Sequence, residues 1–245
     1  MRIWPLSALP EVVPGDDLGA MLAERAGAEG VVPGDILIVA HKVVSKSEGR
    51  IVALADVRPG PAALALAEET GKSPELCELI LSETVRIVRR RGGTLICETH
   101  HGFVCANAGI DSSNAPEGHV ILLPRDPDAS ARRLQARVAS EVGGRVGTVV
   151  IDTHGRPFRR GLVNVAIGVA GFDPILDHRG EHDRNGRILV ATDQAIADEL
   201  AAAAGIYLGK ASGTPAVIAS GVPTLQSPGG ARLLVRDPEH DLFRT

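Results

Sequence analysis

Residues 146–161 read VGTVVIDTHGRPFRRG, an apolar run followed by a polar segment. The first part, 146–151, is rich in β-branched side chains and predicts a buried strand. An acidic residue, a hydroxyl and three arginines follow. A similar run, ILIVA at 36–40, comes after the turn residues of 33–35 and leads into HKVVSKSEGR at 41–50. Polar clusters at the ends of apolar strands are typical of ligand sites in α/β proteins.

The remaining elements follow from periodicity and turn residues. Helices are expected at 62–70, at 74–91, from Asp126-Pro127-Asp128 to Gly143-Gly144, and in the alanine-rich 195–204. Asp128 is the candidate cap of the third helix. Strands are expected at 94–97, 120–123 and 216–219, and the tail, 223–245, is either a helix or a docked arm.

Strands and helices mix without strict alternation. The predicted fold class is therefore α/β, in the sense of mixed α+β with mixed sheets. We expect one domain over residues 1–245, with a candidate subdomain crossing near 144–147.

Composition excludes several classes of protein. The chain has 245 residues and a net charge of −4, from 26 basic and 30 acidic residues, whereas a nucleic-acid binder shows a basic excess. The run at 89–91, three arginines, is expected at the solvated end of a helix. Three cysteines without a CxxC spacing indicate neither a disulfide framework nor a zinc site. They are expected as buried apolar side chains in a reducing compartment.

The chain also shows no sign of a membrane protein. The N-terminus has no apolar run followed by a cleavage site, and no stretch reaches about 18 apolar residues. We expect a cytoplasmic protein.

The cluster at 41–50 has two lysines four residues apart, Lys42 and Lys46, among serines and a glycine. Lysines supply point charges and small residues free backbone N–H groups, a combination that suits phosphate oxygens. The alternative is an exposed polar loop.

The cluster at 107–114 reads NAGIDSSN. Its carboxylate, amide and hydroxyl oxygens suit magnesium or manganese. Alternatively, Asn114 caps a turn and Asp111 satisfies backbone donors.

The cluster at 149–161 places Asp152 and Thr153 directly after the buried strand, an arrangement that suits a divalent ion near phosphates. The guanidinium groups of Arg156, Arg159 and Arg160 are able to clamp phosphates or carboxylates. The alternative is a hairpin turn with surface arginines.

His178 and His182 have the spacing of a helical metal pair, but Gly180 between them favours a polar loop.

Taken together, these clusters resemble the coenzyme F-420 gamma-L-glutamyl ligase family. The matching segments occur in family order and cover most of the chain. They are Gly15-Asp16-Asp17-Leu18, 42–50, 107–114, Asp126-Pro127-Asp128, Asp152-Thr153 with Gly155-Arg156, Ala166-Ile167-Gly168 with Ala170-Gly171, and Ala197-Asp198-Glu199.

The resemblance implies a two-subdomain α/β fold in an intertwined homodimer. It also implies a reaction in which GTP phosphorylates the carboxylate of a deazaflavin precursor and L-glutamate then attacks the acyl phosphate. Further gamma-linked glutamates are a possible extension. Mg²⁺ or Mn²⁺ is the implied cofactor, with K⁺ as an additional candidate.

The resemblance also implies residue roles. Asp111, Asp152 and Thr153 match divalent-metal ligands, and Asp111, Asp152 and Arg156 are the candidate catalytic residues. The matched nucleotide contacts are Leu9, Pro10, Glu11, Val12, His41, Lys42, Lys46, Asn114, Leu208, Gly209, Lys210, Ala211, Ser212 and Gly213. Lys210 stands where some relatives have an acidic metal ligand, and Asp193 is a candidate substitute. Two rival functions are a metal-dependent nucleotide phosphohydrolase and a non-catalytic nucleotide-binding regulator.

Overall fold

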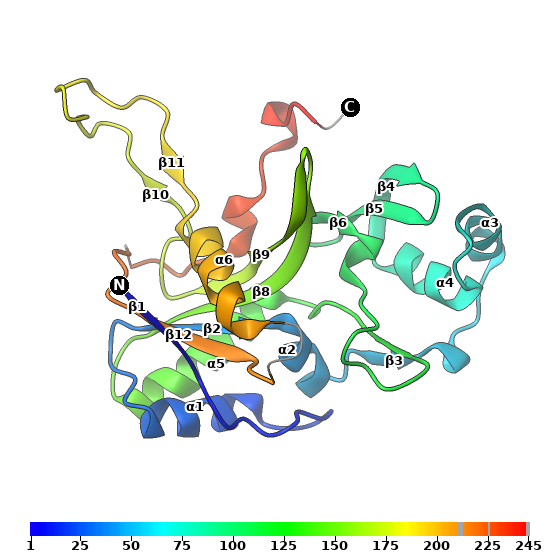
Figure 1. The fold of residues 1–245 in the computed structure, drawn as a ribbon, viewed down its shortest axis with the longest axis horizontal. Coiled ribbons are helices and arrows are strands. Elements are labelled where there is room, and N and C mark those ends of the chain that lie inside the picture. The colour runs from blue at the N-terminus through cyan, green and yellow to red at the C-terminus, as the bar shows by residue number, and fades with distance from the viewer. Residues whose placement is uncertain (210–212, 225, 244–245) are drawn as a thin grey trace.

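The computed structural model describes residues 1–209, 213–224 and 226–243. Its centre is a five-stranded mixed sheet (Figure 1). The strands, in spatial order, are β1 (Arg2–Pro5), β12 (Ala216–Ser220), β2 (Ile36–Ala40), β8 (Gly147–Arg156) and β9 (Arg159–Ala170). β2 and β8 are parallel, and every other neighbouring pair in this sheet is antiparallel. The mixed α/β class expected from the sequence is confirmed.

Helices cover both faces of this sheet. Alternate residues of β2 face opposite sides, as strand geometry requires. Leu37 and Val39 pack with α1 (Leu18–Ala28) and α5 (Pro127–Val142). Ile36 and Ile38 pack with α6 (Ile196–Leu208). The sheet is therefore buried on both faces, which explains the uninterrupted apolar runs of β2 and β8.

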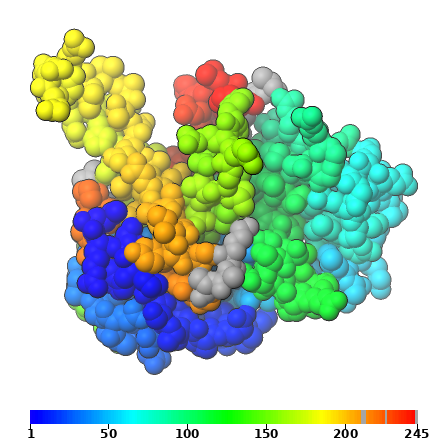
Figure 2. Space-filling view, viewed as in Figure 1, coloured from blue at the N-terminus to red at the C-terminus, as the bar shows by residue number. Residues whose placement is uncertain are grey.

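A second lobe lies beside the sheet and has its own apolar core, in which Cys77, Ile80, Leu95 and Val120 are buried (Figures 1 and 2). It contains β3 (Ile51–Ala53), η1 (Leu54–Asp56), α3 (Pro61–Thr70), α4 (Pro74–Ser82), β4 (Thr84–Arg91), β5 (Thr94–Thr99), β6 (Val104–Ala106), η2 (Asn107–Gly109) and β7 (His119–Ile121). The segment at 144–147, proposed as a subdomain crossing, instead joins α5 to β8 within the first core. The chain leaves the first core after α2 (His41–Ser47) and returns to it before α5.

The predicted helix at 74–91 is wrong beyond Ser82. Residues 84–91 form β4, which pairs with β5 across the turn at Gly92 and Gly93. The arginines of 89–91 therefore lie on a strand and not at a helix end. Paired glycines between two extended runs favour a hairpin, because they adopt the positive φ that tight turns need.

The cap of α5 also differs from the prediction. Asp126, and not Asp128, accepts the hydrogen bond from Ala129 N that begins the helix. The Asp128 carboxylate instead accepts from Val169 N and Ala231 N, and so ties α5 to β9 and to the tail.

The last part of the chain has two features. A projecting arm carries β10 (Leu176–Asp177) and β11 (Asp193–Gln194) and stands away from the body (Figure 2). His178 and His182 lie in its loop and not on a helix, as predicted. The tail docks through η3 (Ala231–Leu234), where Ala231 is buried, and continues to η4 (Pro238–His240).

The three cysteines are free and buried, as expected. Within the described ranges, none of the helices is long and apolar enough to cross a lipid bilayer.

Candidate active site

A cavity of about 970 Å³ opens at the carboxyl ends of β2 and β8. The register pairs Ala40 with Ile151, so the next residues, His41 and Asp152, start the polar segments side by side. The second lobe contributes residues 105–116 to the opposite wall, and the loop at 9–14 closes one end. The three clusters that the sequence singled out therefore meet in one place.

Asp152 is the most constrained carboxylate of the cavity. Its Oδ1 lies 3.1 Å from His41 Nε2 and its Oδ2 lies 3.1 Å from His154 Nε2. Thr153 N donates to Oδ1 over 2.7 Å. Burial by itself raises the pKa of Asp152, but the two imidazoles outweigh burial and lower that pKa below its usual value. Asp152 is therefore held as an anion.

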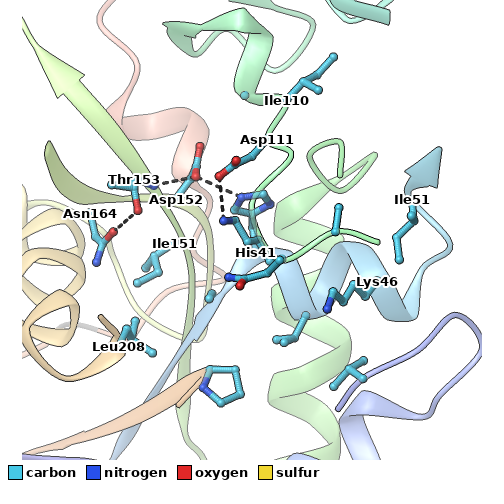
Figure 3. A pocket seen from close by; sticks show the side chains of 18 of the residues that line it. His41, Lys46, Ile51, Ile110, Asp111, Ile151, Asp152, Thr153, Asn164 and Leu208 are labelled. Carbon is cyan, nitrogen blue, oxygen red and sulfur yellow. Dashed lines mark hydrogen bonds and ion pairs between the residues drawn. The ribbon is translucent and has the colours of Figure 1, made fainter. Parts of the chain in front are cut away.

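Asp111 points into the same part of the cavity from the second lobe (Figure 3). Its backbone is fixed by two hydrogen bonds with Ile121. Lys42 Nζ lies 2.8 Å from Asp111 Oδ2, and both the N–H and the hydroxyl of Ser113 donate to the carboxylate. Burial opposes ionisation, yet the bonds from Lys42 and Ser113 lower the pKa of Asp111.

The lysine-rich segment is a helix, α2 (His41–Ser47), and not an exposed loop. Val44 packs into the first core while His41, Ser45 and Lys46 are buried among polar partners. The Lys46 ammonium pairs with Glu11 of the 9–14 loop. Helical spacing places Lys42 and Lys46 on one side of α2, so both cations line the cavity.

Thr153 faces the other side of β8 from Asp152. Its hydroxyl donates to Asn164 Oδ1 on β9 over 2.7 Å (Figure 3). Leu208 at the end of α6 lines the same wall. The Asp-Thr pair thus presents oxygens on both sides of the strand at one edge of the cavity.

These oxygens fit a divalent cation only when other ligands complete the shell. Among the described residues no group of three or more His, Cys, Asp or Glu side chains is placed to hold a metal. The carboxylates of Asp111 and Asp152 and the hydroxyl of Thr153 line the cavity, as does Asn107, whose Oδ1 is buried without a partner. Such hard oxygens suit magnesium or manganese, which keep water and phosphate oxygens as their remaining ligands.

Most of the residues singled out from the sequence line this cavity. They are Leu9, Pro10, Glu11, Val12, His41, Lys42, Lys46, Asp111, Asn114, Asp152, Thr153, Leu208, Gly209 and Gly213. The predicted nucleotide contacts at 210–212 lie outside the described residues.

Two predicted site residues, Arg156 and Asp193, lie outside the cavity. Arg156 is exposed near the tip of the β8–β9 hairpin, and Arg159 and Arg160 are exposed beside it. Asp193 lies on the projecting arm, where its carboxylate is 3.9 Å from Arg179 Nε. Neither Arg156 nor Asp193 lines the cavity of this chain.

The contacts of three cavity residues, His154, Asn164 and Cys105, were not predicted from the sequence. His154 follows Asp152 by two positions, so strand alternation alone would have placed both side chains on one face. Asn164 is the cross-strand partner of Thr153. No pattern in the sequence predicts this pairing. Cys105 lies close to Asp152, and burial, with the charge of Asp152, raises the pKa of its thiol to about 12.

Comparison with known proteins identifies the family of this chain. A profile described as F420-0:Gamma-glutamyl ligase matches residues 7–221. A protein named Coenzyme F420:L-glutamate ligase from Methanothermobacter thermautotrophicus is 47% identical, over 98% of this chain and 97% of its own length. Proteins of the same name from Methanopyrus kandleri and Halobacterium salinarum are 48% and 44% identical, over 100% and 89% of this chain and 98% and 86% of theirs. The chain therefore belongs to the F420-0:Gamma-glutamyl ligase family, a family of ligases.

Proposed function

We propose that this ligase uses GTP to phosphorylate the carboxylate of a deazaflavin coenzyme precursor and then joins that acyl group to L-glutamate. The observation that carries the proposal is one cavity that holds two anionic carboxylates and two lysines. A carboxylate becomes a good electrophile only when one of its oxygens becomes a leaving group. Phosphoryl transfer requires positioned positive charge more than a covalent nucleophile.

Each cluster has a part in that reaction. Lys42 and Lys46 would neutralise the transferring phosphate, and both already lie against anionic partners that phosphate oxygens can replace. Asp111, Asp152 and Thr153 would hold Mg²⁺ or Mn²⁺, which supplies Lewis-acid stabilisation of the phosphate charge. His41 and His154 keep Asp152 ionised and oriented for that role. The 9–14 loop, Asn114 and the end of α6 would surround the nucleotide.

The assembly and location are part of the same proposal. We expect a homodimer in the cytoplasm, with K⁺ as an additional cation. Light scattering on a size-exclusion column should give twice the 25.6 kDa of one chain. The exposed Ile188 and Val190 of the arm are candidates for burial in the dimer. A monomer at micromolar concentration would contradict this expectation.

One assay tests the proposed reaction. The protein is incubated with the deazaflavin precursor, L-glutamate, GTP and manganese, and the products are weighed by mass spectrometry. The expected result is a precursor heavier by one or more glutamyl residues, together with GDP and phosphate. GTP consumption with no added amino acid would identify a phosphohydrolase, and nucleotide binding without turnover would identify a regulator.

A further inference from the structure

A second hollow, of about 250 Å³, lies next to the active-site cavity. Its walls come from β6, from the β8–β9 hairpin, from the first turn of α6 and from the tail after η3. Phe103, Val104 and Val165 make it partly apolar, while Asp198, Asp241 and Arg236 add charge. Its volume is suited to an amino acid and is too small for a nucleotide.

His154 connects the two spaces because it lines both. Its Nε2 lies 3.1 Å from the Asp152 carboxylate, so a ligand that touches this imidazole is one side chain away from Asp152. An acceptor bound there can approach a reacting group at Asp152 without displacing what fills the larger cavity.

Asp198 is the residue of this hollow with the clearest chemistry. It belongs to the Ala197-Asp198-Glu199 segment, which has no part in the active site described above. Its Oδ1 accepts from Ala166 N over 2.8 Å, at the point where the β8–β9 register shifts. That bond satisfies a backbone donor that the irregular pairing frees. Because a carboxylate can accept several hydrogen bonds, one bond to Ala166 leaves Asp198 able to accept from a ligand.

The charge of the hollow favours a ligand with an ammonium group. Asp198 places a carboxylate on the wall of the hollow, and the guanidinium of Arg236 is exposed at its rim. An amino acid carries both charges. Its ammonium group can bind the carboxylate of Asp198, and its carboxylate can bind the guanidinium of Arg236.

We propose that this hollow binds the amino-acid co-substrate, with its α-ammonium on Asp198 and its carbon chain directed toward the rim. The inference rests on the proposed function and specifies where the acceptor enters. The hollow would bring the nitrogen past His154 toward the acyl phosphate formed beside Asp152.

In the second step, the amino acid is joined to the acyl group of the acyl phosphate. The ammonium loses one proton, and the free amine attacks the acyl carbon. A C–N bond forms, and the C–O bond to phosphate breaks. The nitrogen loses a second proton, the phosphate leaves as hydrogen phosphate, and the net reaction releases one proton. Asp198 binds and orients the nitrogen that reacts.

The test separates the two half-reactions. Hydroxylamine replaces the amino acid and traps an acyl phosphate as a hydroxamate, so it reports the first step alone. We expect Asp198→Asn to keep hydroxamate formation within about twofold while raising the KM for L-glutamate about tenfold or more, since it removes a charged hydrogen-bond partner. The asparagine retains an oxygen for Ala166 N, which preserves the structural bond.

Three further variants serve as controls and as an independent test. Asp128→Asn is the matched control, because Asp128 also accepts backbone N–H bonds but lines neither space. Val104→Trp fills the hollow from β6, where Val104 is 41% exposed. Its control is Val85→Trp on the surface of β4, where Val85 is 60% exposed. Saturation-transfer NMR with L-glutamate measures binding directly in every variant and in the wild type.

The outcomes are distinct. Weaker L-glutamate binding in Asp198→Asn and Val104→Trp, with hydroxamate formation retained, supports the proposal. An unchanged KM and unchanged binding in Asp198→Asn, or equal loss of hydroxamate and amide in the folded variant, overturns it. If Asp198→Asn does not fold, the proposal is tested by L-glutamate binding to Val104→Trp, where unchanged binding would overturn it. If the wild type forms neither hydroxamate nor amide, the proposed function fails, and the NMR comparison still decides whether the hollow binds an amino acid.

Discussion

At the residue scale, Asp152 shows how surroundings define a role. A buried carboxylate without partners would take up a proton, yet two imidazoles and a backbone N–H keep this one ionised. The same partners also fix its direction. Asp111, paired with Lys42, faces it from the other lobe, so a cation between the two carboxylates would join the lobes.

Replacing Asp152 should nearly abolish activity. Asp152→Asn keeps the shape of the side chain but removes the charge that the proposed metal site requires. We expect kcat/KM to fall by about a hundredfold or more, since metal stabilisation of phosphate charge contributes several kcal/mol. Asp56→Asn, an exposed aspartate of η1 outside the cavity, is the control. Full turnover of Asp152→Asn, with a native circular dichroism spectrum, would contradict the assigned role.

Lys46 is tested together with its partner Glu11. Lys46→Ala should raise the KM for GTP by about tenfold and lower kcat, because a cation on the transferring phosphate acts in both the ground state and the transition state. Glu11→Gln also breaks the ion pair but leaves the lysine free for phosphate. It should therefore raise the KM for GTP less than Lys46→Ala does, although Glu11 itself lines the cavity. Equal defects in both variants would mean that Lys46 serves only the ion pair.

At the element scale, the β8–β9 hairpin positions the site. It extends past the end of β2 (Figure 1), so one edge of β8 is unpaired beyond Ile151. Residues 151–155 of β8 line the cavity. The register shift between Val150 and Ile151 sets the direction of the hairpin at this point. The hairpin is anchored from α5, where Gly168 lies directly against the backbone of Pro127.

That close approach leads to a stability prediction. A Cβ at position 168 would lie 2.3 Å from Pro127 O, a backbone atom that cannot move aside easily. Gly168→Ala should therefore lower the free energy of unfolding by about 1–3 kcal/mol. Gly155→Ala on the same hairpin is the control, since its nearest neighbour is 3.9 Å away. Urea titration measures both variants, and equal midpoints would show that the hairpin adjusts without cost.

The sequence predicted the buried elements better than the exposed ones. β2, β8 and α6 carry apolar patterns set by burial, and the predictions for them are confirmed apart from their ends. β4 is exposed along most of both faces, so it lacks the alternation that distinguishes a strand from a continued helix. The cap of α5 was misassigned because Asp126 and Asp128 are both near its start, and only the tertiary contacts of Asp128 decide between them.

At the scale of the whole molecule, the cavity forms only when distant segments meet. Asp111 comes from the second lobe, whereas Asp152 and α2 come from the mixed sheet. Each cluster was visible in the sequence because it follows an apolar run. The sequence did not show that the clusters converge, because the residues that connect the two lobes have no distinctive composition. The exposed position of Arg156 likewise depends on the length of the hairpin.

The choice of amino acid also depends on the whole molecule. L-glutamate brings two carboxylates, and Arg156, Arg159 and Arg160 lie on the hairpin that carries Asp152 and His154. The hairpin tip meets the tail, where the Phe158 and Phe243 rings are 6.2 Å apart. These arginines line neither cavity of this chain. Because planar guanidinium groups bind carboxylates in pairs of hydrogen bonds, we predict that one of them meets the second carboxylate of an amino acid whose ammonium lies on Asp198.

We therefore expect L-glutamate to be used in preference to L-aspartate and L-glutamine when all three compete. The first amide should join the precursor carboxylate to the α-amine, and any second residue should be attached through the γ-carboxylate. Tandem mass spectrometry of the product distinguishes these linkages by their fragments. L-glutamine tests the second carboxylate at constant length, and L-aspartate tests the length at constant charge. Equal use of the three would exclude a pocket for two carboxylates and would assign the arginines to another anionic group of the substrates.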